Sequence, residues 1–289
     1  MPPNDWGPER CLTNGVELIF KNAERDIRTA EKAGTDMQLD GIAAIVTGGA
    51  SGLGASTVKM LAARGAKVAV FDVNEQLAGK LTQEVGGLFC RVNVSDDAGV
   101  AEGLAEAERR HGVARVLVNC AGVAAAVKTV GKQNAYHPLD IFRRVIEINL
   151  IGTFNMISKF AARLSAWETK EEERGVIVNT ASVAAYDGQI GQAAYASSKG
   201  GVVGLTLPVA RDLAQHRIRV VTIAPGLFLT PMMMGLPPEV QDSLGKQVPH
   251  PSRLGRPEEY AQLVESIIAN PMLNGEVIRL DGAIRMAPR

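Results

Sequence analysis

The sequence predicts a single α/β domain of the doubly wound Rossmann type, with a parallel seven-stranded sheet and helices on both faces. Short runs rich in Val, Ile and Ala alternate with longer amphipathic runs from about residue 38 onward. These short runs are apolar on both sides, as strands buried between two helical layers must be. The first of them leads directly into a glycine-rich turn and then a helix, the arrangement of a dinucleotide-binding unit.

The expected elements follow this alternation along the chain. Strands are expected at residues 43–47, 67–72, 88–94, 115–119, 175–180, 219–224 and 276–280. Helices are expected at residues 53–64, 75–84, 96–111, 138–160, 193–213 and 257–269. Right-handed crossovers between parallel strands then give the doubly wound fold. Residues 1–36 carry no motif beyond a weak helical pattern at 22–32, so we expect a dispensable extension followed by one domain over 37–289.

One stretch departs from the alternation. Residues 226–255 contain five prolines and three consecutive methionines, Met232–Met234. A long loop in a compact domain is either a binding loop or an irregular connection. Methionine side chains adapt to irregular apolar ligands, and they also fill gaps in a core. The stretch is therefore a candidate substrate loop, with an irregular connection as the alternative.

Composition narrows the class of function. The 31 basic and 31 acidic residues balance, so no net charge favours nucleic acid or an anionic membrane as partner. No apolar run is long enough to span a bilayer, and seven acids within residues 1–36 disfavour a mitochondrial presequence. We expect a cytoplasmic protein. Three cysteines without a CxxC pair and four scattered histidines indicate neither a disulfide framework nor a metal site.

The turn after the first strand, Thr47-Gly48-Gly49-Ala50-Ser51-Gly52-Leu53-Gly54, is typical of a nucleotide site. Gly48 allows a tight turn, Gly52 lets the backbone approach a pyrophosphate, and Gly54 permits close packing of helix on strand. The next helix then offers free N–H groups and the positive end of its dipole to phosphates. Many tight turns use glycine, so the evidence lies in the position of this one between the first strand and a helix.

The acid at the end of the second strand indicates which dinucleotide binds. Asp72 lies 18 residues beyond Gly54, where a carboxylate can accept hydrogen bonds from the ribose hydroxyls of NAD. The same charge would repel the 2′-phosphate of NADP, and no Lys or Arg lies between Gly48 and Gly54. The alternative is a simple strand-end turn residue. The position favours NAD.

Three residues in the second half suggest acid–base chemistry. Tyr195 and Lys199 are four apart in an expected helix and so share one face. A phenol titrates near 10, and a neighbouring ammonium lowers that pKa, which makes Tyr195 a candidate general base. Ser182, after the fifth strand, can donate to a substrate oxygen. Alone, the pair could be a helix-surface contact and the serine a cap, but together with the nucleotide turn they indicate a dehydrogenase.

These motifs resemble the short-chain dehydrogenase/reductase family from about residue 38 to the end. The resemblance is carried by the TGxxxGxG spacing, the turn Asn119-Cys120-Ala121-Gly122, the Ser-Tyr-Lys spacing and Pro225-Gly226. It implies that Asn149 completes the catalytic group by holding a water that relays a proton from Lys199. Asn93 stands where the family has Asp, and its carbonyl can still accept a hydrogen bond from the adenine amine. Thr230 stands where the family contacts the cofactor carboxamide.

The motifs and the resemblance together imply a set of residues that bind NAD. They are Gly48, Ser51, Gly52, Leu53, Gly54, Asp72, Asn93, Val94, Asn119, Cys120, Ala121, Gly122, Tyr195, Lys199, Pro225, Gly226, Phe228 and Thr230.

Segments near the C-terminus resemble particular members of that family. GQIGQAAYASSKGG, SRLG and LDGAIRM are similar to the enzymes that interconvert 3-hydroxyacyl-CoA and 3-ketoacyl-CoA with NAD. That resemblance implies a homotetramer, some activity on hydroxysteroids, and a substrate oxygen held by Ser182 and Tyr195 with Gln189 orienting the substrate. Residues 128–137 and 165–174 are expected to border the acyl-CoA entrance.

Two other functions stay open on the sequence. The first is a dehydrogenase of the same fold that acts on hydroxysteroids or other secondary alcohols, because fold does not fix substrate. The second is a non-catalytic NAD-binding scaffold subunit. The presence of Asn149, Ser182, Tyr195 and Lys199 together favours an enzyme.

Overall fold

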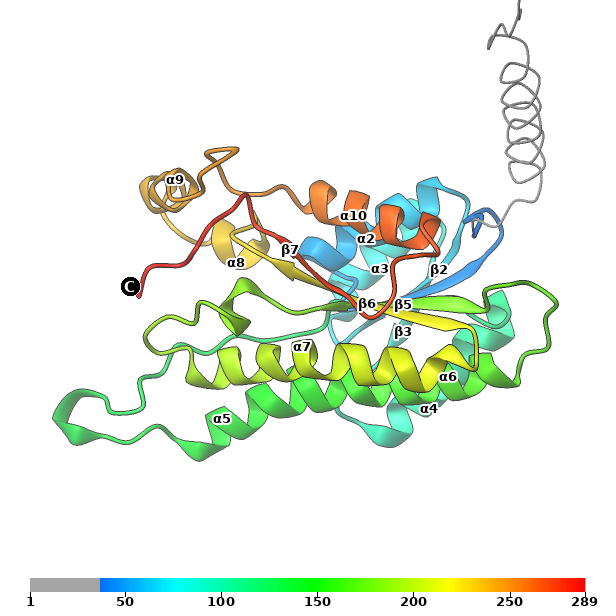
Figure 1. Ribbon diagram of the computed structural model, residues 1–289, viewed down its shortest axis with the longest axis horizontal. Helices are drawn as coiled ribbons and strands as arrows, with labels where there is room; N and C mark the ends of the chain where they lie inside the picture. The colour runs from blue at the N-terminus through cyan, green and yellow to red at the C-terminus, as the bar shows by residue number, and fades with distance from the viewer. Residues whose placement is uncertain (1–36, 289) are drawn as a thin grey trace, which may run out of the picture. The chain divides into compact units, whose positions relative to one another are not determined.

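The structure, a computed structural model, describes residues 37–288, which form one seven-stranded parallel sheet (Figure 1). The strand order is β3-β2-β1-β4-β5-β6-β7, so the order reverses between β1 and β4 as in a doubly wound fold. The predicted fold class is thereby confirmed. The strands are β1 (Ala43–Thr47), β2 (Lys67–Asp72), β3 (Leu88–Arg91), β4 (Val116–Asn119), β5 (Gly175–Thr180), β6 (Ile218–Pro225) and β7 (Val277–Leu280). The expectations for residues 1–36, including the helix at 22–32, lie outside the described residues.

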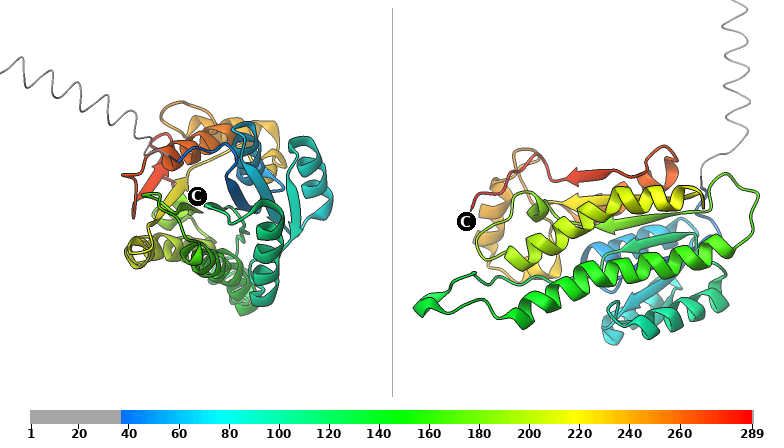
Figure 2. Two further views of the ribbon diagram at one scale, coloured as in Figure 1. Left: turned by 90° about the vertical axis from the view of Figure 1, so that its right-hand side faces the viewer. Right: turned by 60° about the horizontal axis from the view of Figure 1, so that its bottom comes forward.

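Two helical layers cover the sheet, one on each face (Figures 1 and 2). One layer holds α2 (Gly52–Ala63), α3 (Glu75–Val85) and α10 (Pro257–Ala269), and the other holds α4 (Asp97–His111), α6 (Gly152–Ala166) and α7 (Ala193–Ala214). Successive residues of each strand alternate between the two cores. Ala44 and Val46 pack in the core under the first layer, and Ile45 packs in the core under the second. Within residues 37–288, no helix is long and apolar enough to cross a membrane.

The long helix expected at residues 138–160 contains a change of helix type. It consists of α5 (Leu139–Ile146), one π-helical turn over Glu147–Ile151, and α6, which extends to Ala166. Such π turns are rare and occur mainly at functional sites. Asn149 lies in the middle of this turn. The apolar pattern of the sequence carries no sign of it.

The proline-rich stretch at residues 226–255 contains two short helices. It contains α8 (Pro231–Met234) and α9 (Pro238–Lys246). Both helices begin with proline at the first helical position, where the missing N–H would have no partner in any case and the fixed φ suits a helix. Two of the five prolines in residues 226–255 therefore mark helix starts, and the role of the stretch as a substrate loop stays a prediction.

The segment at residues 165–174 lies at the opposite end of the sheet from the position expected for it. It completes α6 and leads into the start of β5, at the amino-terminal edge. Arg115 donates to the carbonyls of Arg174 at 2.8 Å and Glu173 at 2.7 Å, and Arg217 donates to the carbonyl of Thr169 at 3.1 Å. The segment therefore does not border a site at the carboxyl edge, and that expectation was wrong.

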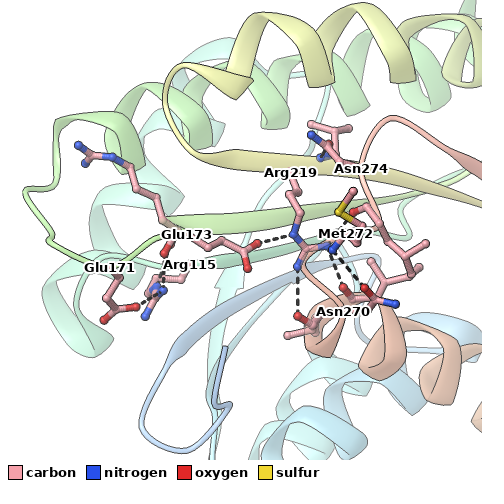
Figure 3. A network of polar contacts seen from close by, with 12 residues as sticks. Arg115, Glu171, Glu173, Arg219, Asn270, Met272 and Asn274 are labelled. Carbon is pink, nitrogen blue, oxygen red and sulfur yellow. Dashed lines mark hydrogen bonds and ion pairs between the residues drawn. The ribbon is translucent and has the colours of Figure 1, made fainter. Parts of the chain in front are cut away.

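A buried arginine joins three elements at this amino-terminal edge (Figure 3). Arg219 of β6 is 6% exposed, and its Nε donates to Glu173 at 2.7 Å. Its Nη1 donates to the carbonyls of Ile267 at 2.9 Å and Leu273 at 2.8 Å, and its Nη2 donates to Ile268 at 3.1 Å. Two of these carbonyls lie in the last turn of α10 and lack partners within the helix. One side chain thus fixes α10 and the segment before β5 to the central sheet.

We predict that Arg219→Met lowers the free energy of unfolding by about 3–5 kcal/mol, because it leaves Glu173 buried without its partner. The matched control is Lys59→Met, which removes the ion pair with Glu84 at 2.8 Å, where both side chains are more than half exposed. That change should cost less than about 1 kcal/mol. Urea denaturation measures both, and equal losses would contradict the assignment.

Candidate active site

A cavity of about 890 Å³ opens at the carboxyl edge of the sheet, beside the point where strand order reverses. This is where open α/β sheets bind their ligands. The turns after six strands, β1 to β6, contribute to its wall, together with α7 and α8. The predicted residues that line it are Gly48, Ser51, Gly52, Leu53, Gly54, Asp72, Asn93, Val94, Cys120, Ala121, Gly122, Ser182, Gln189, Tyr195, Lys199, Pro225, Gly226, Phe228 and Thr230.

The turn from β1 to α2 leaves no room for side chains at two of its glycines. Gly48 has a φ of 60°, and a Cβ there would lie 2.7 Å from the backbone of Ala121. A Cβ on Gly54 would lie 2.2 Å from the carbonyl oxygen of Gly48. The N-cap of α2 is Ser51, whose side chain makes no capping hydrogen bond, and the first turn of the helix contains no acid. The first N–H groups of α2 therefore suit an anion such as a pyrophosphate.

The carboxylate of Asp72 is fixed at the end of β2. One oxygen accepts from the backbone N–H of Ala50 at 3.0 Å, and the other accepts from Asn74 at 2.9 Å. Each carboxylate oxygen has a second lone pair for a ligand hydroxyl. Among the described residues that line the cavity, the two bases are Arg144 and Lys199, which come from α5 and α7 and not from the turns around Asp72. This end of the cavity suits a ribose with free hydroxyls.

The turn after β3 is held by its own side chains. The Oδ1 of Asn93 accepts from the backbone N–H of Ser95 at 3.2 Å, which uses one of its two lone pairs. Val94 is buried, and its carbonyl accepts from the side chain of Asn155 at 2.9 Å. Asn93 keeps one acceptor site for a ligand amine.

Two predicted residues lie behind the cavity wall. Asn119 is 3% exposed and donates to the side chain of Asn179 at 2.9 Å, which joins β4 to β5. Asn149 is fully buried, and its amide accepts from Val123 N at 2.8 Å and donates to Val123 O at 2.8 Å and Ser198 Oγ at 3.0 Å. Asn149 thus ties the π turn to α7 and to the segment after β4. Both residues support the wall and do not face the cavity.

Burial dominates the electrostatics of Tyr195 and Lys199. Lys199 is 5% exposed, donates to the carbonyl of Thr180 at 2.7 Å, and lies 5.9 Å from the centre of the Tyr195 ring. Burial lowers the pKa of Lys199 from 10.5 to about 8. Burial also raises the pKa of Tyr195, and a hydrogen bond with Ser182 lowers it. Lys199 was expected to lower the pKa of Tyr195, but in this site burial, which raises it, is the largest effect.

Two further residues at the site were missed by the sequence argument. The hydroxyl of Thr180 lies 2.7 Å from that of Tyr260 on α10 and donates to the carbonyl of Asn119 at 2.6 Å. A hydroxyl has one proton, so Tyr260 is the donor to Thr180. The thiol of Cys120 lies 3.7 Å from the Tyr260 oxygen. Tyr260 is fully buried and so fixes, from behind, the residue whose carbonyl holds Lys199. The one available signal was a tyrosine on an otherwise apolar helix face.

Comparison with known proteins gives a consistent result. A family model described as short chain dehydrogenase matches residues 42–241. The 3-hydroxyacyl-CoA dehydrogenase type-2 of Rattus norvegicus is 54% identical over 252 residues, which are 86% of this chain and 97% of that protein. The protein of the same name from Drosophila melanogaster is 52% identical over 248 residues, or 84% of this chain and 97% of its own length.

More distant relatives and a solved structure agree on the fold. The ipsdienol dehydrogenase of Ips pini is 34% identical over 245 residues, which are 83% of this chain and 96% of that protein. The crystal structure of 3-hydroxyacyl-CoA dehydrogenase type-2 from Mycobacterium avium is 40% identical, with a TM-score of 0.83. The match covers 86% of this chain and 98% of that one.

Proposed function

The chain belongs to the short-chain dehydrogenase family, and from this premise we propose that it interconverts 3-hydroxyacyl-CoA and 3-ketoacyl-CoA with NAD. Membership makes it an oxidoreductase that acts on CH–OH groups of small molecules with a nicotinamide cofactor. The observation that carries the proposed chemistry is the presence of Ser182, Tyr195 and Lys199 in one cavity. The choice of thioester rests on the relatives named 3-hydroxyacyl-CoA dehydrogenase type-2.

In the proposed reaction the residues of this chain accept one proton from the substrate and hold one substrate oxygen. The nicotinamide cofactor, when bound, supplies the hydride acceptor. Tyr195 takes the hydroxyl proton of the substrate as general base. Ser182, which in the ligand-free site donates to Tyr195, would turn its single proton to the same substrate oxygen as that oxygen becomes a carbonyl. Burial raises the pKa of Tyr195, and a positive charge on a ligand bound near it would favour the phenolate and lower that pKa.

Lys199 and Asn149 complete the proposed group. With a pKa of about 8, Lys199 can exchange protons close to neutral pH. We propose that a water held at Asn149 carries the proton onward. The side-chain amide of Asn149 already bonds to Val123 and Ser198. These bonds fix the backbone around Asn149, where the water is proposed to bind.

We also propose that the protein is a homotetramer. The edge strand β7 is only half-buried along its length, and large apolar side chains are exposed on α6, α7 and the π turn, namely Phe154, Leu207 and Ile151. Exposed apolar surface of this kind favours protein contacts. A second copy of the chain would cover it.

We predict that the protein uses NAD in preference to NADP, because the carboxylate of Asp72 would repel a 2′-phosphate. The check is kcat/KM with each cofactor. Asp72→Ala should lower the ratio of kcat/KM with NAD to kcat/KM with NADP by at least about tenfold. One neighbouring charge changes an equilibrium constant by about that factor or more. Equal use of the two cofactors by the unmodified protein would contradict the assignment.

The substrate proposal is tested by NADH oxidation with acetoacetyl-CoA, with a bare ketone and with a ketosteroid. We expect the thioester to give the highest kcat/KM. Tyr195→Phe should keep the fold and NAD binding but lose about a hundredfold to ten-thousandfold in turnover, the usual contribution of an acid–base group. If Tyr195→Phe turned over normally, the mechanism would be wrong. If a ketosteroid were the better substrate, the hydroxysteroid alternative would replace the thioester.

A further inference from the structure

The chain after β7 returns to the cavity and contributes to its wall. Residues 281–288 turn back across the carboxyl edge of the sheet (red in Figures 1 and 2). Ile284 is 1% exposed and anchors the start of this tail in the core. Two residues later, Met286 is half-buried and lines the cavity that holds Ser182 and Tyr195. The tail is therefore part of the site.

Three hydrogen bonds hold the tail against the segment between Ser182 and Tyr195. The backbone N–H of Met286 donates to Asp187, and the side chain of Gln189 donates to the carbonyl of Ala287 at 2.9 Å. The backbone N–H of Ile190 donates to the carbonyl of Pro288 at 3.0 Å. The amide nitrogen of Gln189 is thus used to hold the tail, which differs from its expected use in orienting the substrate.

Arg279 of β7 holds two segments against the sheet: the tail and the segment between Ser182 and Tyr195. Its Nη2 donates to Asp187 at 2.6 Å and to the carbonyl of Ile284 at 3.0 Å, and its Nε donates to Asp281 at 2.7 Å. The guanidinium also lies 5.1 Å from the centre of the Tyr186 ring. The hydrogen bond from Arg279 lowers the pKa of Asp187, so this carboxylate stays ionised. The position of Met286 is therefore set by the hydrogen bonds of Arg279 and Asp187.

We propose that Met286 is a specificity-determining residue that contacts the acyl chain of the substrate, and that Gln189 is a positioning residue that acts through the tail. The proposal rests on the proposed function. A second methionine, Met233 of α8, lines the same cavity from a different element. Thioether side chains are flexible and apolar, and they suit an acyl group of variable shape. The tail therefore limits how long or branched an acyl chain the site accepts.

The test is the ratio of kcat/KM for a long 3-ketoacyl-CoA to that for acetoacetyl-CoA. Met286→Ala removes apolar volume from the wall and should raise this ratio about tenfold, whereas Met286→Trp should lower it by a similar factor, as expected for a few methylene groups in an apolar pocket. The matched control is Met272→Ala, since Met272 is 90% exposed and does not line the cavity. The control should leave the ratio unchanged.

A second variant tests the positioning role of Gln189. Gln189→Ala should shift the ratio in the same direction as Met286→Ala, and it should add nothing further in the Met286→Ala background, because both act on one structural element. A uniform loss of kcat/KM for all thioesters in both backgrounds would mean that Gln189 contacts the substrate directly, which overturns its positioning role.

The outcomes separate this proposal from the proposed function. Turnover of thioesters with the same ratio in Met286→Ala and the unmodified protein overturns the role of Met286 and leaves the proposed function standing. Absence of thioester turnover in the unmodified protein overturns both.

Discussion

The site depends on one hydrogen bond, from the buried amine of Lys199 to the carbonyl of Thr180 at 2.7 Å. Thr180 ends β5 and Lys199 lies on α7, so this contact sets how the helix meets the carboxyl edge of the sheet. Tyr195, one turn earlier on α7, is placed in the cavity by the same contact. Tyr260 fixes Thr180 from behind with a hydroxyl contact of 2.7 Å. Because the amine is buried to make this bond, its pKa falls to about 8.

The amino-terminal edge of the sheet contributes to stability, and the carboxyl edge carries the candidate active site. At the amino-terminal edge, Arg219 and Glu173 form a buried ion pair that also holds the last turn of α10. At the carboxyl edge, the chain uses glycines, short turns and partly exposed polar groups that a ligand can approach. The helix that leads to this edge also contains irregular backbone, the π turn around Asn149, of a kind found mainly at functional sites. The C-terminal tail, held by Arg279, adds the last part of the cavity wall.

Local patterns predicted the sheet and most of the cavity lining. Strand β1, the glycine turn after it and Asp72 are each visible in a few consecutive residues, because burial on both faces and tight turns impose local composition. What the sequence did not show depends on contacts between distant residues. The pairing of Thr180 with Tyr260 spans 80 positions, and that of Gln189 with Ala287 spans 98. Burial of Lys199, which sets its pKa, exists only once α7 has packed on the sheet.

Burial, more than Lys199, sets the pKa of Tyr195 until a positively charged cofactor binds, and this is the central claim. The direct measurement is the pH titration of tyrosinate absorbance in the unmodified protein and in Tyr195→Phe, because their difference belongs to Tyr195. In the cofactor-free protein, the account predicts a midpoint above 10, the ordinary value for tyrosine. It predicts a lower midpoint with NAD than with NADH, since only the oxidised ring adds positive charge. A midpoint below 10 without cofactor would contradict the account.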